Sequence, residues 1–144
     1  MKLLNQLKNI RIFTNCINNL NVLSPVVTVN LIGGQYRVER QDFVGHLTER
    51  FIKGLYFDNA ILGIDSVNEK GGLMAMDFDT ALIDECLIDQ SNHVTIVSDS
   101  GKFGKNNLVS FATLDDVNTV ITDTNLSKED YKLYSKYSAE IIRV

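Results

Sequence analysis

The sequence predicts an α/β fold, a largely parallel sheet flanked by helices. Short β-branched, apolar runs alternate with runs of helical periodicity, and this order is typical of βαβ units. The 144 residues are enough for one domain with a substantial core. Hydrophobic residues make up 44% of the chain and charged residues 22%, which indicates an ordinary globular protein.

The first part of the chain predicts strand, helix, strand, edge strand and helix. The expected ranges, in that order, are Ile10–Phe13, Asn15–Leu23, Val26–Ile32, Gln35–Val38 and Gly45–Leu55. Pro25 is expected to end the first helix, since proline disrupts a helix interior. Gly33 and Gly34 are expected to break the strand before them.

The second part continues the alternation. A strand at Phe57–Ile64 and a polar turn at Asn68–Gly72 precede a helix at Asp79–Asp89. The remaining strands are expected at Val94–Ser98, Leu108–Ala112, Thr119–Thr122 and Ala139–Val144. Ser127 followed by Asp130 resembles a capping box, which predicts a helix reaching about Tyr137.

The net charge of −4 is unevenly distributed along the chain. Residues 1–54 carry seven Lys/Arg against three Asp/Glu, whereas residues 55–144 carry seven against fifteen. The acidic second part argues against a large nucleic-acid surface, and the basic first part either attracts an anion or is simply solvated. No stretch of 18 apolar residues predicts a transmembrane helix, and Cys16 and Cys86 suit reduced thiols in a cytoplasmic protein.

The loop Asp99–Gly104 is the strongest candidate for a ligand site. It follows a predicted strand, and open α/β sheets bind ligands at the carboxyl ends of their strands. Lys102 between two glycines suits a phosphate or a hydroxyl-rich ligand, or it is a solvated surface lysine. Asp99 either binds hydroxyl groups, holds Lys102 or caps nearby backbone N–H groups. Asp123, after another strand, is read as structural or as part of the same site.

Several short motifs, in order through roughly residues 10–144, resemble the C-terminal effector-sensing domain of the DeoR family of bacterial transcriptional repressors. The matching pieces are Phe13-Thr14-Asn15, Leu31-Ile32-Gly33-Gly34, Phe43-Val44-Gly45, Asp58–Asp65, Gly71-Gly72, Asp99–Gly104 and Ile121-Thr122-Asp123. The resemblance implies a ribose-5-phosphate isomerase or coenzyme A transferase-like fold. It also implies that the winged helix-turn-helix and the strand-helix unit with the Gly-Thr-Thr phosphate loop are missing. Residues 1–144 are then one sensing domain, incomplete at its N-terminus.

The resemblance further implies a phosphorylated sugar effector, a homo-oligomer, and contact with DNA only through the absent N-terminal domain. It assigns the effector to Thr14, Asn15, Gly33, Gly34, Asp65, Asp99 and Lys102. We expect no catalytic residues, cofactor, metal or membrane partner. A sugar-phosphate isomerase and a degenerate, non-binding remnant are the alternatives.

Four of these residues also have plain structural interpretations. Asp65 suits a turn, Asn15 suits a helix cap, and Gly33 and Gly34 suit an ordinary turn. Tyr131, Tyr134 and Tyr137 form a stripe that favours packing or a subunit contact. His46 and His93 lack the spacing of metal ligands.

Overall fold

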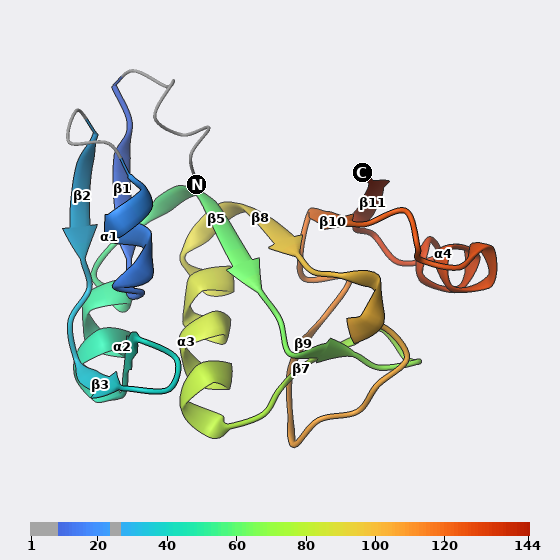
Figure 1. The fold of residues 1–144 in the computed structure, drawn as a ribbon, viewed down its shortest axis with the longest axis horizontal. Helices are drawn as coiled ribbons and strands as arrows, with labels where there is room; N and C mark the ends of the chain where they lie inside the picture. The colour runs from blue at the N-terminus through green and yellow to red at the C-terminus, as the bar shows by residue number, and fades with distance from the viewer. Residues whose placement is uncertain (1–8, 24–26) are drawn as a thin grey trace. The chain divides into compact units, whose positions relative to one another are not determined.

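The computed structural model describes residues 9–23 and 27–144. The chain divides into two compact units, Met1–Gly54 and Leu55–Val144, which we call unit 1 and unit 2. Figure 1 shows the course of the chain from one end to the other. Each unit is described in its own right below.

Unit 1 contains one parallel and one antiparallel strand pair. Its described elements are β1 (Arg11–Thr14), α1 (Asn18–Val22), β2 (Thr28–Leu31), β3 (Gln35–Arg37), β4 (Asp42–Val44) and α2 (His46–Lys53). β1 and β2 run parallel, with Thr14 opposite Leu31, so their carboxyl ends lie at the same edge. β3 and β4 form an antiparallel hairpin, clamped by a two-pronged ion pair between Arg37 and Asp42.

Two expectations for this unit were wrong in detail. The helix predicted from Asn15 begins only at Asn18, because the residues before it pair with the hairpin. Phe43 N–H donates to the Asn15 carbonyl, and Cys16 forms a bridge with Asp42. The periodicity missed β4, which is only three residues long. Pro25 and Val26 lie outside the described residues, and so does the predicted role of Pro25.

Unit 2 confirms the parallel sheet. Its elements are β5 (Phe57–Gly63), β6 (Ser66–Val67), β7 (Gly72–Ala75), α3 (Phe78–Asp89), β8 (Ser91–Val97), the 3₁₀ turn η2 (Ser100–Lys102), β9 (Val109–Thr113), β10 (Thr119–Thr122), α4 (Lys128–Tyr134) and β11 (Glu140–Arg143). Four strands form an all-parallel sheet in the order β11-β10-β8-β5. The strand predicted at Leu108–Ala112 is β9, which lies instead in a separate antiparallel sheet, β6-β7-β9.

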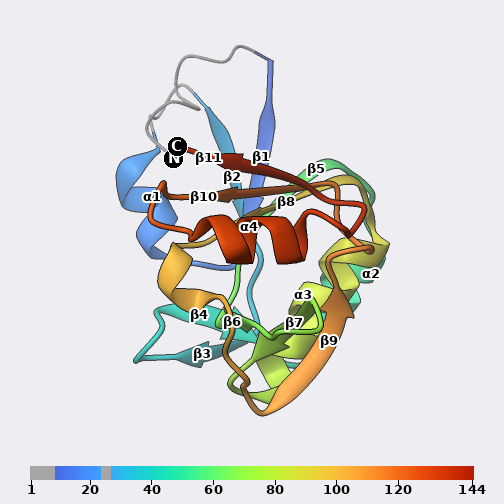
Figure 2. The same cartoon turned by 90° about the vertical axis from the view of Figure 1, so that its right-hand side faces the viewer.

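The core of unit 2 lies on one side of the parallel sheet. Figure 2 shows α4 and α3 on the same side of strands β8, β10 and β11. Leu62, Ile96, Val120 and Ile141 face this core and are at most 9% exposed. Tyr134 of α4 packs among them and is fully buried.

Both α-helices of unit 2 begin at side chains that favour a helix N-terminus. Asp77 accepts a hydrogen bond from Thr80 N–H at the start of α3. Ser127 accepts one from Asp130 N–H at the start of α4, which confirms the predicted cap. α4 nevertheless ends at Tyr134, three residues earlier than expected. Beyond the helix, the ring of Tyr137 packs against Gly71, in the space that a Cβ on this glycine would need.

Candidate functional site

The loop after β8 is a short, ordered turn. Lys102 N–H donates to the Asp99 carbonyl and Phe103 N–H donates to that of Ser100, which forms the 3₁₀ turn η2. Lys102 itself is half-buried and Asp99 is exposed. The Asp99 side chain makes no cap hydrogen bond, so the capping interpretation of Asp99 was wrong. The turn therefore presents Lys102 on an ordered backbone.

Asp123, at the end of the neighbouring strand β10, holds the start of this turn. Its two carboxylate oxygens accept from Ser100 N–H at 2.7 Å and from the Ser100 hydroxyl at 2.9 Å. The N–H of Asn125 donates to the same carboxylate at 2.9 Å. These hydrogen bonds, that from Ser100 N–H being the largest cause, lower the pKa of Asp123 from 3.8 to about 2. The Asp123 carboxylate thus links the end of β10 to the turn after β8, which agrees with the interpretation of Asp123 as a structural residue.

A buried tyrosine holds the other end of the turn. Phe103 inserts into the core with its ring centroid 5.2 Å from that of Tyr134. Gly104 N–H donates to the Tyr134 hydroxyl at 3.1 Å, and burial raises the pKa of that hydroxyl above 10.0. The N–H of Gly104 is thus used within the protein.

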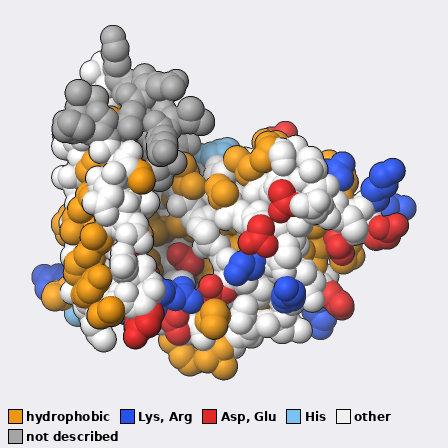
Figure 3. Space-filling model, viewed as in Figure 1, with side chains coloured by type: hydrophobic (Ala, Val, Ile, Leu, Met, Phe, Trp, Pro, Cys, Tyr) orange, Lys and Arg blue, Asp and Glu red, His pale blue; other side chains and the backbone are white. Residues whose placement is uncertain are grey.

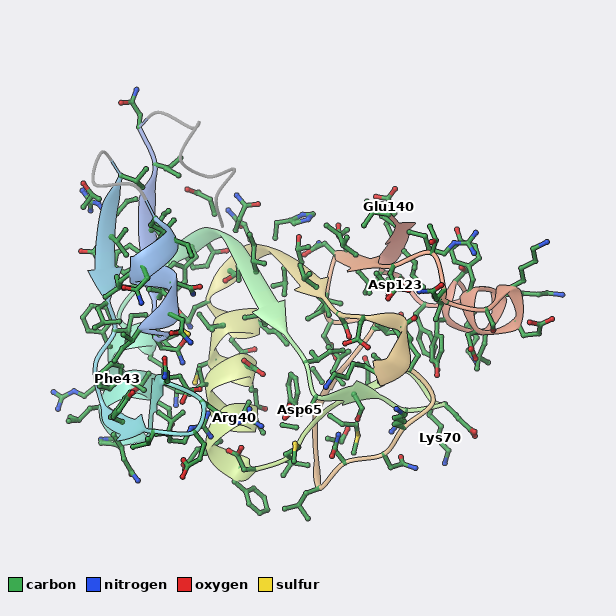
Figure 4. The ribbon with its side chains drawn as sticks, viewed as in Figure 1. Arg40, Phe43, Asp65, Lys70, Asp123 and Glu140 are labelled. Atoms are coloured by element: carbon green, nitrogen blue, oxygen red, sulfur yellow. The ribbon has the colours of Figure 1, made fainter. Side chains whose placement is uncertain are left out.

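Asp65 follows β5, the strand next to β8 in the sheet. Its carboxylate accepts a hydrogen bond of 2.8 Å from Met76 N–H, which ties the loop after β5 to the end of β7. Asp65 is therefore part of the turn structure, as its plainer interpretation held. Figure 4 shows Asp65 in the loop that follows β5 and Asp123 where β10 leads toward α4.

Thr14 and Asn15 in unit 1 lie at the end of β1. The Thr14 hydroxyl oxygen accepts from Asn19 Nδ2 at 2.8 Å and from Cys16 N–H at 3.2 Å. Asn15 Nδ2 donates to the Phe43 carbonyl at 3.0 Å. Because α1 has Ile17 at its N-cap position, the helix-cap interpretation of Asn15 was wrong. Both side chains organise the edge where β1 meets the hairpin.

Gly33 and Gly34 follow β2 at that same edge and have different environments. A Cβ on Gly33 would meet no atom within 4 Å. A Cβ on Gly34 would collide with the Thr48 side chain and lie 2.7 Å from the Val44 carbonyl oxygen. The Thr48 hydroxyl, fully buried in α2, donates to the Gly33 carbonyl at 3.0 Å. Gly34 therefore permits a close approach of the loop to α2, and Gly33 has no such constraint.

Sequence reasoning missed Thr48, which lies in the middle of a segment assigned only as an amphipathic helix. Thr48 lies in the first turn of α2 and meets Gly33 and Gly34 only in the folded chain, so the sequence contains no pattern that would predict this contact. Unit 1 thus brings Thr14, Asn15, Gly33 and Gly34 to one strand edge, and unit 2 brings Asp99, Lys102 and Asp123 to two neighbouring strand ends.

Two kinds of site find no support in residues 9–23 and 27–144. No group of three or more His, Cys, Asp or Glu side chains among them is arranged to hold a metal ion. In the same residues, no helix has the length and apolar character needed to cross a membrane.

The chain resembles known regulators over most of its length. Residues 1–124 match the family model described as the DeoR C terminal sensor domain. The glycerol-3-phosphate regulon repressor of Escherichia coli is 34% identical over 117 residues, which cover 80% of this chain and 46% of the relative. The regulator GlpR of Haloferax volcanii, described as HTH-type, is 31% identical over 101 residues, or 70% of this chain and 40% of the relative.

A third relative is the lactose phosphotransferase system repressor of Staphylococcus epidermidis, 28% identical over 131 residues, or 88% of this chain and 52% of the relative. The chain spans about half the length of these curated relatives.

Proposed function

This chain belongs to the DeoR C-terminal sensor domain family, and from that premise we propose that it senses a phosphorylated sugar or a similar small phosphate ester. Its relatives are transcriptional regulators of carbohydrate-related genes, so the proposed role is regulatory. In this role the effector stabilises one arrangement of subunits, and a DNA-binding region outside these residues responds to that population shift.

Lys102 carries the proposal for unit 2. It is the only cation in the strand-end loop 98–104, and the loop is held from both sides, by Asp123 at Ser100 and by Tyr134 at Gly104. A held turn loses little conformational entropy when it binds a ligand. The ammonium group suits a phosphate, and the exposed Asp99 carboxylate, with Asp65 beside the neighbouring strand, suits sugar hydroxyls.

For unit 1, taken by itself, we propose Thr14, Asn15, Gly33 and Gly34 as effector contacts. Both parallel strands end at this edge, which is the usual location of ligands in α/β sheets. Gly33 leaves open space beside the backbone, and Gly34 keeps the loop against the start of α2, where the N-cap residue Gly45 makes no side-chain cap hydrogen bond and a helix N-terminus suits an anion. Thr14 and Asn15 would also position this edge through their internal hydrogen bonds.

The test is a thermal-shift titration of the full chain with glycerol 3-phosphate and a panel of hexose phosphates, each beside its unphosphorylated parent. At 100 times its Kd, a ligand should stabilise the fold by about 2.7 kcal/mol, a shift of several degrees. Lys102→Ala should remove most of that shift. Lys105→Ala is the matched control, because Lys105 is an exposed lysine three residues further along the chain, just after loop 98–104.

Three results would contradict the proposal. One is a Lys102→Ala protein that responds to the best phosphate as the parent does, which removes Lys102 from the site. Another is conversion of the phosphate ester to product, followed by NMR, which favours the isomerase alternative. The third is the absence of any shift across the panel, which favours a non-binding remnant.

A further inference from the structure

The 3₁₀ turn η2 is held at both ends by a single later segment, residues 123–134, which runs from the end of β10 through α4. At the start of the turn, Ser100 N–H donates to the Asp123 carboxylate. Just after the turn, Gly104 N–H donates to the Tyr134 hydroxyl. All of these atoms belong to unit 2. The geometry of the turn therefore depends on where this segment lies.

α4 is a short helix with one anchor in the core. Its seven residues are too few for a helix that is stable by itself, and Tyr134 is the one among them that is fully buried. Figure 3 shows charged side chains gathered over α4 at the right-hand edge of the view. The exposed ones in its first five residues are Lys128, Glu129 and Lys132. An element with so few buried contacts opens locally at a lower free energy than the core strands.

Opening of α4 removes two supports of the turn at the same time. The Tyr134 ring leaves Phe103, whose ring centroid is 5.2 Å away in the closed arrangement. The Tyr134 hydroxyl also leaves Gly104 N–H without its acceptor. Phe103 directly follows Lys102, the last residue of η2. The backbone that presents Lys102 therefore loses its fixed position when α4 opens.

Thermodynamic linkage makes this dependence reciprocal. A ligand that binds only the ordered turn stabilises the state in which α4 is docked, and it does so by its own binding free energy. The family match covers residues 1–124, so it assigns no role to α4 at Lys128–Tyr134. The coupling follows from contacts within unit 2.

We propose that α4 is a latch on the effector turn. While docked, α4 holds the turn in the form that binds the effector, and an effector bound at Lys102 keeps α4 docked. The effector half of this inference rests on the proposed function of Lys102, whereas the coupling between α4 and the turn does not. α4 is then the part of unit 2 that changes when the effector binds.

The first test needs no ligand and uses native-state amide hydrogen exchange of the full chain. Ser127→Ala removes the N-cap hydrogen bond of α4, which should raise the opening constant of the helix about fivefold. The amides of Phe103 and Gly104 should then exchange about fivefold faster, together with that of Tyr131 in α4. Ser127→Thr keeps the hydroxyl and should restore the rates of the parent.

The control amide is Met76 N–H, which is bonded to Asp65 in a different loop and should exchange as in the parent. The coupling is overturned if Tyr131 exchanges faster while Phe103 and Gly104 do not. It is also overturned if Met76 responds equally, since the variant would then destabilise unit 2 as a whole. A variant in which none of these amides responds overturns it too, because α4 would not open separately.

The second test adds glycerol 3-phosphate, or the hexose phosphate of the panel that binds most tightly, at 100 times its Kd. Exchange at Tyr131 should slow by the same factor as at Phe103 and Gly104, about hundredfold, and Lys102→Ala should abolish the slowing.

Slower exchange in the turn alone overturns the latch and leaves the proposed function intact. If no ester binds the parent, the proposed function fails and the effector half of the latch fails with it. The rates measured without ligand still decide whether α4 and the turn open together.

Discussion

Both units hold a candidate effector loop at the end of parallel strands, but they hold it by different means. In unit 2, side chains fix the loop. Asp123 accepts a hydrogen bond from Ser100 N–H, and the buried Tyr134 packs against Phe103 and accepts a hydrogen bond from Gly104 N–H. In unit 1, the backbone itself approaches α2, and this approach is possible because Gly34 lacks a side chain. Substitutions that remove side-chain atoms should therefore destabilise the loop of unit 2, and substitutions that add side-chain atoms should destabilise the loop of unit 1.

Tyr134→Ala should give the largest effect. It removes a fully buried ring from the core and also the acceptor for Gly104 N–H, so we expect unit 2 to lose about 3–5 kcal/mol of stability. Tyr134→Phe should cost only about 1 kcal/mol, because it keeps the ring and removes one hydrogen bond. Denaturant unfolding together with amide hydrogen exchange measures both. Equal losses for the two variants would show that the ring does not anchor the turn.

Gly34→Ala should have the next largest effect and should act on unit 1. The new methyl group would collide with Thr48 and with the Val44 carbonyl, and such overpacking costs about 1–3 kcal/mol. Gly33→Ala is the matched control, with open space at its Cβ. It should be neutral or slightly stabilising, since it restricts the unfolded chain. A comparable loss in both variants, measured by exchange of unit 1 amides, would contradict the close-approach argument.

The smallest effect should come from Asp123→Asn and should change stability only at acidic pH. The pKa of Asp123 is about 2 in the folded chain against an ordinary value of 3.8. A lowered pKa adds stability that is fully present above the ordinary value and is lost as the pH falls from about 4 to about 2. Asp123→Asn should flatten that part of the pH–stability curve, whereas Asp99→Asn, which removes no cap hydrogen bond, should not. The measurement is thermal unfolding between pH 2 and pH 5. If stability falls with pH in the same way for the parent and for Asp123→Asn, the Asp123 carboxylate does not stabilise the turn.

Much of the fold was predictable because its signals are local. β5, β8, β10 and α3 lie within a few residues of their predicted positions, since long apolar runs and helical periodicity depend on near neighbours. The cap at Ser127 was predictable for the same reason. β4, β6 and β7 were not predicted, because these strands of two to four residues contain few β-branched side chains. β9 was predicted as a strand, but its antiparallel pairing with β7 was not.

The candidate site was predictable in its residues more than in their roles. The sequence indicated the loops at Gly33-Gly34 and Asp99–Gly104 as strand-end turns, and both are where it predicted. The hydrogen bonds of Asn15 to Phe43, of Asp65 to Met76 and of Gly104 to Tyr134 join positions 11 to 30 residues apart. Partners at that separation come together only on folding.

By itself, the sequence determined the alternation of strands and helices, the parallel sheet and the family, because these depend on the order of side chains along the chain. Only the tertiary structure decided that Asp123 holds the turn bearing Lys102 and that Gly34 allows the loop after β2 to approach α2 closely. Each of these depends on which atoms from distant segments share the same space, and packing alone determines that.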